Sequence, residues 1–454
     1  MLRKQTAIWQ IGLAVFPSFA AAYTNPQWAL QSVSGPSPRT LHGMVWDSCR
    51  NVVVLHGGLS DPTHRLGDTW EWNGSEWSLR ATSGLGQRLG QGMAFDSDRC
   101  VTVVFGGVDG LGNYKNDTWE WDGTTWVQKC TSGCTPPGTR NTPSMSYDAA
   151  QHAIVLFGGY GPGLLNDTWE WNGSTWAQVT TTIPRPSPRS SPAMGYDPVR
   201  KRIVIFGGNL VPAICGAHSD ETWELDLATN PATWTIVATP QRPDPRGENS
   251  HIVYEPNRNG MVLFGGTDFC TTTFDDTWEY DGETWVQIST STAPEGRHGH
   301  DMVYDAVRQE IVLFGGDLGP LSDWDVRGDT WTFGEAGPIP VLIDIKPGSA
   351  LNSINLGSRG VIPVAILTSD EFDAANVDPD TVQLAGSSVA LRGNGSRLLA
   401  ALTDVDHDGD WDLMLHVSTE NLQLQVGATT AVLTGMTWDG EAIEGSDIVN
   451  IVPP

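Results

Sequence analysis

Five aspartates stand at alternate positions of one short segment near the C-terminus, and they are the residues of this chain best suited to bind a metal ion. The segment DVDHDGDWDL contains Gly409 and places the carboxylates at Asp404, Asp406, Asp408, Asp410 and Asp412. Carboxylate oxygens are the hard ligands that Ca²⁺ prefers, and the glycine allows a sharp turn around the ion. We therefore predict a calcium site at residues 404–412. The alternative is a solvated acidic turn.

The predicted calcium loop resembles two known loops to different extents. It begins like an EF-hand, but Leu415 stands at the twelfth position, where the EF-hand has a bidentate glutamate. It is more similar to the loops of integrin-type FG-GAP repeats, D-x-D-x-D-G-x-x-D-L. That resemblance implies a carbonyl ligand from Asp410 and side-chain ligands from Asp404, Asp406, Asp408 and Asp412.

The six cysteines offer a second kind of chemistry, disulfide formation. An even number of cysteines in an exported chain favours disulfides. Their spacing and their places in the repeat described below favour the pairs Cys130–Cys134, Cys215–Cys270 and Cys49–Cys100. A redox role for the CTSGC segment is disfavoured, because it lacks the CxxC spacing that lowers a thiol pKa.

The elements that must position these groups repeat along the chain. An apolar run that ends in Gly-Gly recurs about every 50 residues, at residues 57–58, 106–107, 158–159, 207–208, 265–266 and 315–316. Each copy is followed by Thr-Trp, at Trp70, Trp119, Trp169, Trp223, Trp278 and Trp331. Six concordant copies predict six equivalent structural units.

Each repeat predicts four strands. In the sixth repeat, a first strand and a turn precede residues 311–314, which are apolar throughout, as expected of a strand covered on both faces. In the second repeat, residues 118–121 alternate between polar side chains and tryptophan, the period of a strand. Asp122–Gly123 then predicts a two-residue hairpin turn, and Trp126 begins the outer strand.

This pattern resembles the kelch repeat, in which each copy forms one blade of a β-propeller. The resemblance implies an all-β fold, with a six-bladed kelch β-propeller in residues 23–336. The sixth repeat lacks its outer strand, and the segment around Trp28 is similar to the outer strand around Trp77. We therefore predict that residues 25–34 complete the last blade and remove an open sheet edge.

Residues 337–454 lack the repeat and form a second predicted domain. Short β-like runs, including LQLQV at residues 422–426, are separated by Gly, Asp, Asn and Pro. This arrangement is typical of a β-sandwich. The stretches IDIKPGS and EGSDIVNIV resemble an accessory module of exported bacterial proteins, and this resemblance implies a location rather than an activity.

The N-terminus and the charge favour an exported protein. Residues 1–22 predict a signal peptide, because Arg3 and Lys4 precede an apolar run and small residues. No later apolar run reaches 18 residues, so we predict no membrane insertion. The formal net charge of −27 disfavours nucleic acid and anionic membranes as partners. We expect a secreted, soluble monomer.

Several repeated residues have both a structural and a functional interpretation. One arginine precedes each first strand, and we expect it to pair with the acid of the D/E-T-W segment rather than to form a ring around an anion. His42 and His300 follow two of these arginines, and we interpret them as ordinary kelch positions rather than as ligands of a shared metal. Most tryptophans are expected to pack the blades rather than to bind a sugar.

Two functional hypotheses follow. The first is a binding protein that recognises an extracellular glycan or protein with the variable loops after Gly-Gly. Its candidate side chains are His64, Arg65, Tyr114, Lys115, His218, Phe269, Trp324 and Arg327. The alternative is a kelch-type carbohydrate-active enzyme, either a sugar epimerase or a copper oxidase resembling galactose oxidase. We assign no catalytic residue, and Ca²⁺ is the only cofactor that we predict.

Overall fold

The computed structural model of the chain describes residues 26–211, 217–248, 251–268, 270–319, 324–335, 337–349, 351–369, 372–393 and 397–452. The predicted signal peptide lies outside these residues. Residues 26–335 form one compact unit, and the described residues from 337 onward belong to another. Within these ranges no helix is long and apolar enough to span a membrane.

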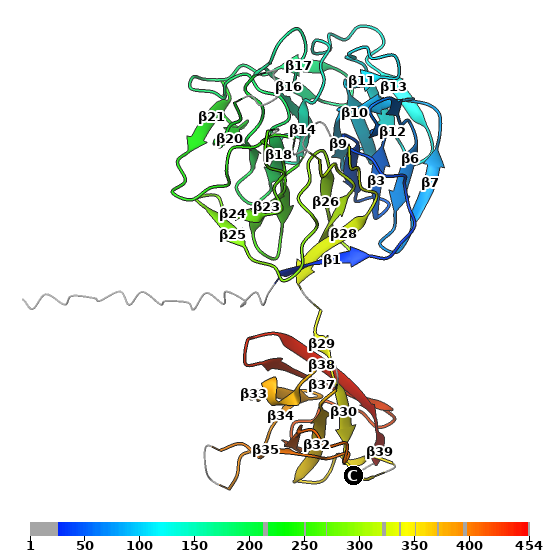
Figure 1. The fold of residues 1–454 in the computed structure, drawn as a ribbon, viewed down its shortest axis with the longest axis vertical. Helices are drawn as coiled ribbons and strands as arrows, with labels where there is room; N and C mark the ends of the chain where they lie inside the picture. Colours follow the sequence, from blue (N-terminus) through cyan, green and yellow to red (C-terminus); the bar gives the residue numbers. More distant parts are fainter. Residues whose placement is uncertain are drawn as a thin grey trace, which may run out of the picture. The chain divides into compact units, whose positions relative to one another are not determined.

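Residues 26–335 form a six-bladed β-propeller, and every blade is a four-stranded sheet. Figure 1 shows the sheets around a central axis, with β9, β14, β18 and β26 near the axis and β7, β17, β21 and β25 at the periphery. Each innermost strand contacts the innermost strands of both neighbouring blades, so that the ring is continuous.

The strands of the first three blades, from the axis outward, are β2 (Gly43–Asp47), β3 (Val52–His56), β6 (Thr69–Trp72) and β7 (Trp77–Ala81); β9 (Gly92–Asp96), β10 (Val101–Phe105), β12 (Thr118–Trp121) and β13 (Trp126–Lys129); and β14 (Ser144–Asp148), β15 (Ala153–Phe157), β16 (Thr168–Trp171) and β17 (Trp176–Gln178). Those of the last three are β18 (Ala193–Asp197), β19 (Arg202–Phe206), β20 (Thr222–Asp226) and β21 (Thr233–Val237); β22 (Val253–Glu255), β23 (Gly260–Phe264), β24 (Thr277–Tyr280) and β25 (Trp285–Ile288); and β26 (Asp301–Asp305), β27 (Glu310–Phe314), β28 (Thr330–Glu335) and β1 (Pro26–Gln31). The second strand of each blade is the apolar run of the repeat, and its side chains are buried on both faces.

The ring closes through the N-terminal strand, at the place where the sequence predicts it. β1 pairs antiparallel with β28, from Gln27 opposite Gly334 to Gln31 opposite Thr330. Trp28 is 2% exposed, and its ring centroid lies 5.0 Å from those of Phe264 and Phe333. The last blade therefore combines three strands from the end of the propeller with one from its beginning.

The arginine before each innermost strand is buried and ion-paired within its own blade, as predicted. Arg140 donates from Nη1 and Nη2 to the two carboxylate oxygens of Asp167 at 2.7 and 2.9 Å, and from Nη1 to the carbonyl of Gly158 at 2.9 Å. The equivalent pairs are Arg39–Asp68, Arg88–Asp117, Arg189–Glu221, Arg246–Asp276 and Arg297–Asp329. These cations are neutralised inside the blades and are not presented to an anion.

The threonine and the outer-strand tryptophan of the repeat join neighbouring blades. Trp126 donates from Nε1 to Thr69 Oγ1 at 2.9 Å across the boundary between the first two blades. The same hydrogen bond crosses the other five boundaries, as Trp176–Thr118, Trp234–Thr168, Trp285–Thr222, Trp28–Thr277 and Trp77–Thr330. The predicted packing role is confirmed for these tryptophans.

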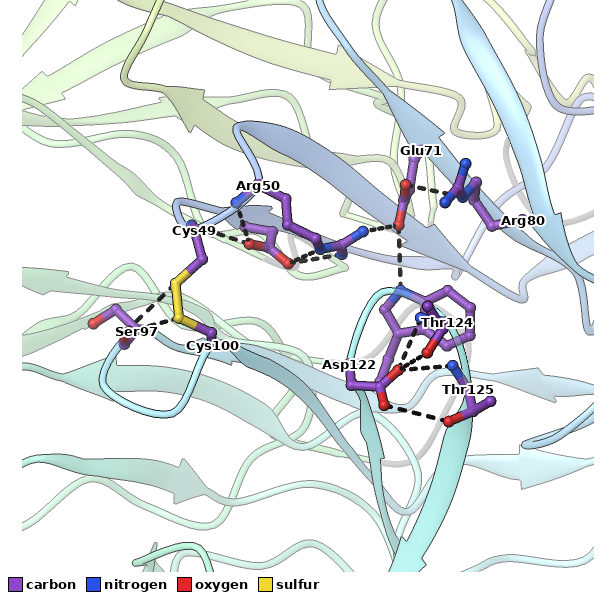
Figure 2. Close-up of polar contacts among 11 residues, drawn as sticks. Cys49, Arg50, Glu71, Arg80, Ser97, Cys100, Asp122, Thr124 and Thr125 are labelled. Atoms are coloured by element: carbon purple, nitrogen blue, oxygen red, sulfur yellow. Dashed lines mark hydrogen bonds and ion pairs between the residues drawn. A yellow bond between two sulfur atoms is a disulfide. The ribbon is translucent and has the colours of Figure 1, made fainter.

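In each blade the inner turn joins the first two strands and the outer turn joins the last two. An arginine from the inner turn of one blade also covers the outer turn of the next blade. Figure 2 shows the carboxylate of Glu71 between Arg50 and Arg80. A Cβ atom at Gly123 would lie 2.8 Å from Arg50, so this Asp-Gly turn requires glycine both for its φ of 93° and for the contact. The third blade has Gln151 at the position of Arg50, and the fourth blade, which follows it, has no Asp-Gly or Asn-Gly turn.

Two of the three predicted disulfides are confirmed. Cys49–Cys100 joins the inner turns of the first two blades, with Cα atoms 5.8 Å apart (Figure 2), and Cys130–Cys134 closes a short loop. Cys270 is also disulfide-bonded. Its predicted partner, Cys215, lies outside the described residues.

The described residues between 337 and 452 form a β-sandwich. One sheet has the order β29-β38-β37-β33-β34, the other has the order β30-β32-β36-β35, and β31 pairs with β39. The bounds are β29 (Ile339–Pro340), β30 (Leu342–Ile345), β31 (Ser353–Asn355), β32 (Val361–Leu367), η1 (Ala374–Asn376), β33 (Val377–Leu384), β34 (Ser387–Ser388), β35 (Ala400–Thr403), β36 (Asp412–Ser418), β37 (Thr430–Thr437), β38 (Ala442–Ile448) and β39 (Asn450–Val452). Side chains from both sheets fill a single core.

The predicted strand at residues 422–426 is wrong. Leu422 and Leu424 pack against the core of the sandwich, but the segment is a loop that is held by one hydrogen bond from Gln423 N to Ala385 O. Alternating leucines reproduce the period of a strand, and here they serve to anchor a loop.

Candidate binding site on the propeller axis

The innermost strands of the blades enclose a channel along the axis. Its wider part has a volume of about 340 Å³ and is lined by side chains of all six innermost strands. A narrower part of about 40 Å³ lies toward the loops that follow Gly-Gly. Met93, Met145 and His251 line both parts and therefore lie where the two parts adjoin.

Aromatic side chains line the wider part, one from each blade, at the end of the innermost strand that is farther from the Gly-Gly loops. They are Trp46, Phe95, Tyr147, Tyr196, Tyr254 and Tyr304. Methionines lie two residues earlier in five blades, at Met44, Met93, Met145, Met194 and Met302. Because alternate residues of a strand share a face, the aromatic and methionine side chains of one strand lie on the same side of it, and there they pack in the hydrophobic cluster between two neighbouring blades.

The tyrosines among these aromatic residues lie near polar groups of the turns around them. Tyr254 donates to Asn259 Oδ1 at 2.9 Å. Burial and the carboxylates of Asp96 and Asp98 raise the pKa of Tyr147 to about 12. Burial and Asp148 likewise raise the pKa of Tyr196. Tyr147 and Tyr196 are therefore neutral, and all three tyrosine side chains are partly exposed.

A ring of backbone hydrogen bonds encircles the loop-face end of the channel. The residue two after each repeated arginine has a positive φ, at Leu41, Gly90, Thr142, Ser191, Glu248 and Gly299. Five bonds of the ring are present among the described residues, with N···O distances of 2.7–3.1 Å, namely 41→299, 90→41, 142→90, 191→142 and 299→248. This ring narrows the channel on the face where we expected the ligand, and the larger cavity lies toward the opposite face.

A partly buried ion pair lies where the two parts of the channel adjoin. His251 Nδ1 is 2.5 Å from Asp301 Oδ1, and Asp301 also accepts the N–H groups of Met44 and Met302 at 2.7 and 2.9 Å. Burial lowers the pKa of His251, but Asp301 and backbone groups of Met93 and Met145 raise it above its ordinary value overall. Because Asp301 engages Nδ1 of His251 and is itself held by two backbone N–H groups, we assign the pair to closing the channel.

The sequence itself contains a signal for this pair. Four residues after the repeated arginine, four repeats have Gly43, Gly92, Ser144 and Ala193, whereas the sixth has Asp301. The fifth repeat has one extra residue before β22, and this places His251 at the same level. Two ionisable residues at a position that is otherwise small indicate an axial feature.

Replacement of His251 by glutamine is expected to lower stability most at acidic and neutral pH. The folded state holds the imidazole proton more tightly than the unfolded chain does, so it binds more protons from about pH 6.5 up to the raised pKa. The contribution of the imidazole proton to the free energy of unfolding is complete below about pH 6.5, and it is lost as the pH rises through the folded-state pKa. Urea unfolding of both proteins between pH 5.5 and 9 measures the difference.

The exposed His64 provides the control for this experiment. His64→Gln is expected to change the free energy of unfolding by less than about 0.5 kcal/mol at every pH. Parallel stability curves for the natural chain and His251→Gln would show that the axial histidine carries no linked proton.

The predicted loop residues lie on several different blades. His64 and Arg65 form β5 (His64–Arg65), which pairs with β4 (Leu59–Asp61), and His64 contacts Asp61 at 2.5 Å. Tyr114 packs edge-on against Tyr160, with centroids 6.1 Å apart, and Lys115 lies 3.6 Å from Asp109. The loops adjoin the connections between blades, as predicted, through bridges such as Thr40–Leu59 and Asn141–Tyr160.

The remaining loop candidates come from the fourth, fifth and sixth blades. His218 forms a bridge with Asn209, and burial lowers its pKa. Phe269 lies outside the described residues. Trp324 is 39% exposed. Arg327 binds the carboxylates of Glu295 and Asp325 at 2.9 and 2.8 Å.

The structure brings three aspartates of the predicted calcium loop together. One carboxylate oxygen from each of Asp404, Asp406 and Asp412 lies within 4.8 Å of the others. Asp412 is held in place by the N–H groups of Thr368 and Val405, at 2.9 and 2.7 Å. Asp408 accepts the N–H of Asp410 at 3.1 Å, and burial together with Asp408 raises the pKa of Asp410 to about 6.

His42 and His300 occupy equivalent buried positions in neighbouring blades. Each packs edge-on against a phenylalanine, Phe314 and Phe264 respectively. Burial and Arg297 lower the pKa of His300 to about 3, and burial and Arg39 lower that of His42 well below its usual value. Two neutral histidines packed on aromatic rings fit the structural interpretation. The one group of possible metal ligands within the described residues is the aspartate cluster.

Comparisons with known proteins agree with this architecture. The sequence profile of the KLHDC2/KLHL20/DRC7 Kelch-repeats domain matches residues 18–191 and 124–316. The structure described as "Structure of YjhT" superposes with a TM-score of 0.50 at 14% identity, over 66% of this chain and 96% of that one. At this identity the likeness shows the fold alone.

Two curated proteins are similar over shorter segments. Mei4-dependent protein 6 of Schizosaccharomyces pombe (strain 972 / ATCC 24843) is 33% identical over 94 residues, which are 19% of this chain and 13% of that protein. F-box/kelch-repeat protein At1g51550 of Arabidopsis thaliana is 31% identical over 115 residues, or 22% and 23% of the two chains. The chain thus spans less than a quarter of the length of these relatives.

Proposed function

Because the chain belongs to the kelch-repeat family, we propose that it is a secreted binding protein whose propeller recognises an extracellular protein through the loops after Gly-Gly. One observation carries this proposal. The repeated arginine, acid, threonine and tryptophan are used in bonds within and between blades, whereas the loops differ in length and sequence from blade to blade. The invariant part of each repeat builds the scaffold, and the variable part is available for recognition.

The long loop of the sixth blade offers the most suitable anchor. Trp324 is partly exposed, and Arg327 lies three residues away. Tryptophan and arginine are enriched among the residues that dominate protein–protein interfaces. Glu295 and Asp325 hold the Arg327 guanidinium in place, and this reduces the entropy that is lost when a partner binds it.

Replacement of both Trp324 and Arg327 by alanine is expected to lower the affinity for the protein partner at least tenfold and to leave folding intact. The ion pairs of Arg327 are exposed and contribute little to stability, so the melting temperature should change by less than about 2 °C. Binding is measured against a panel of extracellular proteins and a glycan array. Strong binding to a glycan and to none of the proteins would replace the protein partner by a carbohydrate.

The matched control is Val307→Ala. Val307 is also an exposed apolar side chain, but it lies on the inner turn of the sixth blade, on the opposite face. This variant should keep full affinity. Equal weakening by both variants would contradict a loop-face site.

For the C-terminal domain, we propose that residues 404–412 bind Ca²⁺. The convergence of Asp404, Asp406 and Asp412 supports this, together with Asp404 Oδ1, which is buried and has no hydrogen-bond partner. Asp408 and the carbonyl of Asp410 would complete the oxygen donors. The bound ion would neutralise the carboxylates and stabilise the turn before β36.

Calcium is therefore expected to raise the melting temperature of the C-terminal domain in the full chain. Binding to the folded state alone stabilises it by about 2.7 kcal/mol at a hundredfold excess over Kd. Differential scanning calorimetry with millimolar Ca²⁺ and with a chelator measures the shift, and the propeller transition should stay constant. Asp404→Ala should abolish the shift, and Asp410→Asn should preserve it. A melt that is insensitive to calcium, with no ion bound by titration calorimetry, would leave only an acidic turn.

A further inference from the structure

The narrower part of the axial channel is a small polar chamber behind the loops that follow Gly-Gly. Its volume is about 40 Å³, and the His251–Asp301 pair forms its floor. This is room for one small polar group, because a single water molecule already takes about 10–15 Å³. We propose that the chamber binds the ammonium group of a lysine side chain that the protein partner inserts from the loop face. The inference rests on the proposed loop-face function and adds the chemistry of one partner residue.

Two buried side chains of the chamber have an oxygen atom with no hydrogen-bond partner among the described residues. They are Gln91, which is 7% exposed, and Ser191, which is 8% exposed. Gln91 Nε2 donates to the carbonyl of His56 at 2.9 Å, and this bond fixes the amide so that Oε1 remains as an acceptor. A buried polar atom costs stability unless water or a ligand supplies the missing hydrogen bond. The chamber therefore has a place for a group that donates hydrogen bonds.

Glu248 supplies a third acceptor. It lines the chamber, and its Oε2 lies 3.7 Å from Nδ1 of His298, while a carboxylate has acceptor sites for several donors. Gln91, Ser191 and Glu248 precede the innermost strands of the second, fourth and fifth blades, so the acceptors come from different sides of the axis. An ammonium group has three N–H donors and no acceptor, and it can donate to each of them. A guanidinium is a wider, rigid fork and suits the chamber less well.

The charges around the chamber also favour a cation. The carboxylates of Glu248, Asp301 and Asp317 lie at this end of the axis, and the imidazoles of His251 and His298 lie beside them. The carboxylates outnumber the imidazoles even when both rings are protonated. The repeated arginines contribute no free cation here, because each is paired with an acid of its own blade.

The chamber is reached from the loop face through the ring of backbone hydrogen bonds. Leu41, Thr142 and Glu248 belong to this ring, line the chamber and are partly exposed. The lysine side chain carries its charge at the end of four unbranched methylenes, which suits a narrow opening. This entrance lies on the face that also presents Trp324 and Arg327, so one partner can contact both.

The test compares three small probes on the full chain. They are n-butylammonium, which reproduces the lysine side chain, its uncharged counterpart 1-butanol, and n-propylguanidinium, which reproduces the arginine side chain. In ligand-observed NMR, n-butylammonium should bind saturably, with a Kd at least about tenfold lower than those of the other two. Equal binding of the guanidinium would show that the site selects charge alone and would overturn the assignment to lysine. Without saturable binding of n-butylammonium, the chamber would hold water alone and the inference would fail.

Variants locate the bound ammonium group. Glu248→Gln removes a charge and Ser191→Ala removes a hydroxyl, and each should raise the Kd of n-butylammonium at least about fivefold. The control is Glu283→Gln, which removes an exposed carboxylate from an outer turn and should have no effect. Unchanged binding by either variant, once folded, would place the amine elsewhere and refute the assignment. A chain that binds no n-butylammonium but binds its protein partner through Trp324 and Arg327 would refute the lysine site and leave the loop-face function in place.

Discussion

Removal of residues 26–34 is expected to abolish the cooperative folding of the propeller. These residues include β1, which supplies the outer strand of the last blade through pairing with β28. Without them, β28 becomes an open edge, and the boundary between the fifth and sixth blades loses the Trp28–Thr277 hydrogen bond. A ring propeller relies on every boundary, so the loss is not confined to one blade. Thermal unfolding of a chain that starts at residue 35 measures the effect, and an unchanged midpoint and cooperativity would contradict closure by this strand.

A single substitution measures how much the packing of the closing strand stabilises the propeller while the backbone of that strand stays in place. Trp28→Ala removes a side chain that packs on Phe264 and Phe333, and is expected to cost about 3–5 kcal/mol. Leu30, on the same strand, is 55% exposed, and Leu30→Ala should cost less than about 0.5 kcal/mol. Similar losses from both variants would mean that β1 contributes backbone pairing rather than packing.

Replacement of Arg140 by alanine is expected to destabilise the propeller by about 3–5 kcal/mol. The guanidinium is almost fully buried, and its loss leaves Asp167 and the carbonyl of Gly158 without their main donor. Trp169 Nε1, which donates to the same carboxylate at 2.7 Å, cannot neutralise it. Chemical denaturation at neutral pH measures the loss.

Two companion variants test the cause of that loss. Arg140→Lys keeps the charge but not the two-pronged geometry, so it should recover only part of the stability. Arg185 is exposed, and Arg185→Ala should change stability by less than about 0.5 kcal/mol. Burial raises the pKa of Asp167, but the Arg140 guanidinium holds this pKa below its usual value. The contribution of the pair is thus present above about pH 4 and is lost as the pH falls through the folded-state pKa. A loss independent of pH through this range would point to packing instead of charge.

Much of the propeller could be predicted because each repeat contains both partners of its main local interactions. The arginine, the acid before Thr-Trp and the Gly-Gly carbonyl belong to one blade, so a single repeat contains both partners of the ion pair. The similarity of the segments around Trp28 and Trp77 was sufficient to predict the closing strand, because equivalent positions make equivalent contacts. The Cys49–Cys100 pair followed from the same equivalence.

The axial site depended on the tertiary structure. His251 and Asp301 are 50 residues apart and meet only because neighbouring blades bring the same strand position to the axis. The cavity that all six innermost strands line likewise appears only when the six blades face one another. In the C-terminal domain, spacing predicted the acidic loop, whereas the anchoring of Asp412 at the start of β36 determined that its carboxylate meets those of Asp404 and Asp406. Periodicity in a sequence specifies what each unit contains, and the closing of the units into a ring decides which side chains of different units share one space.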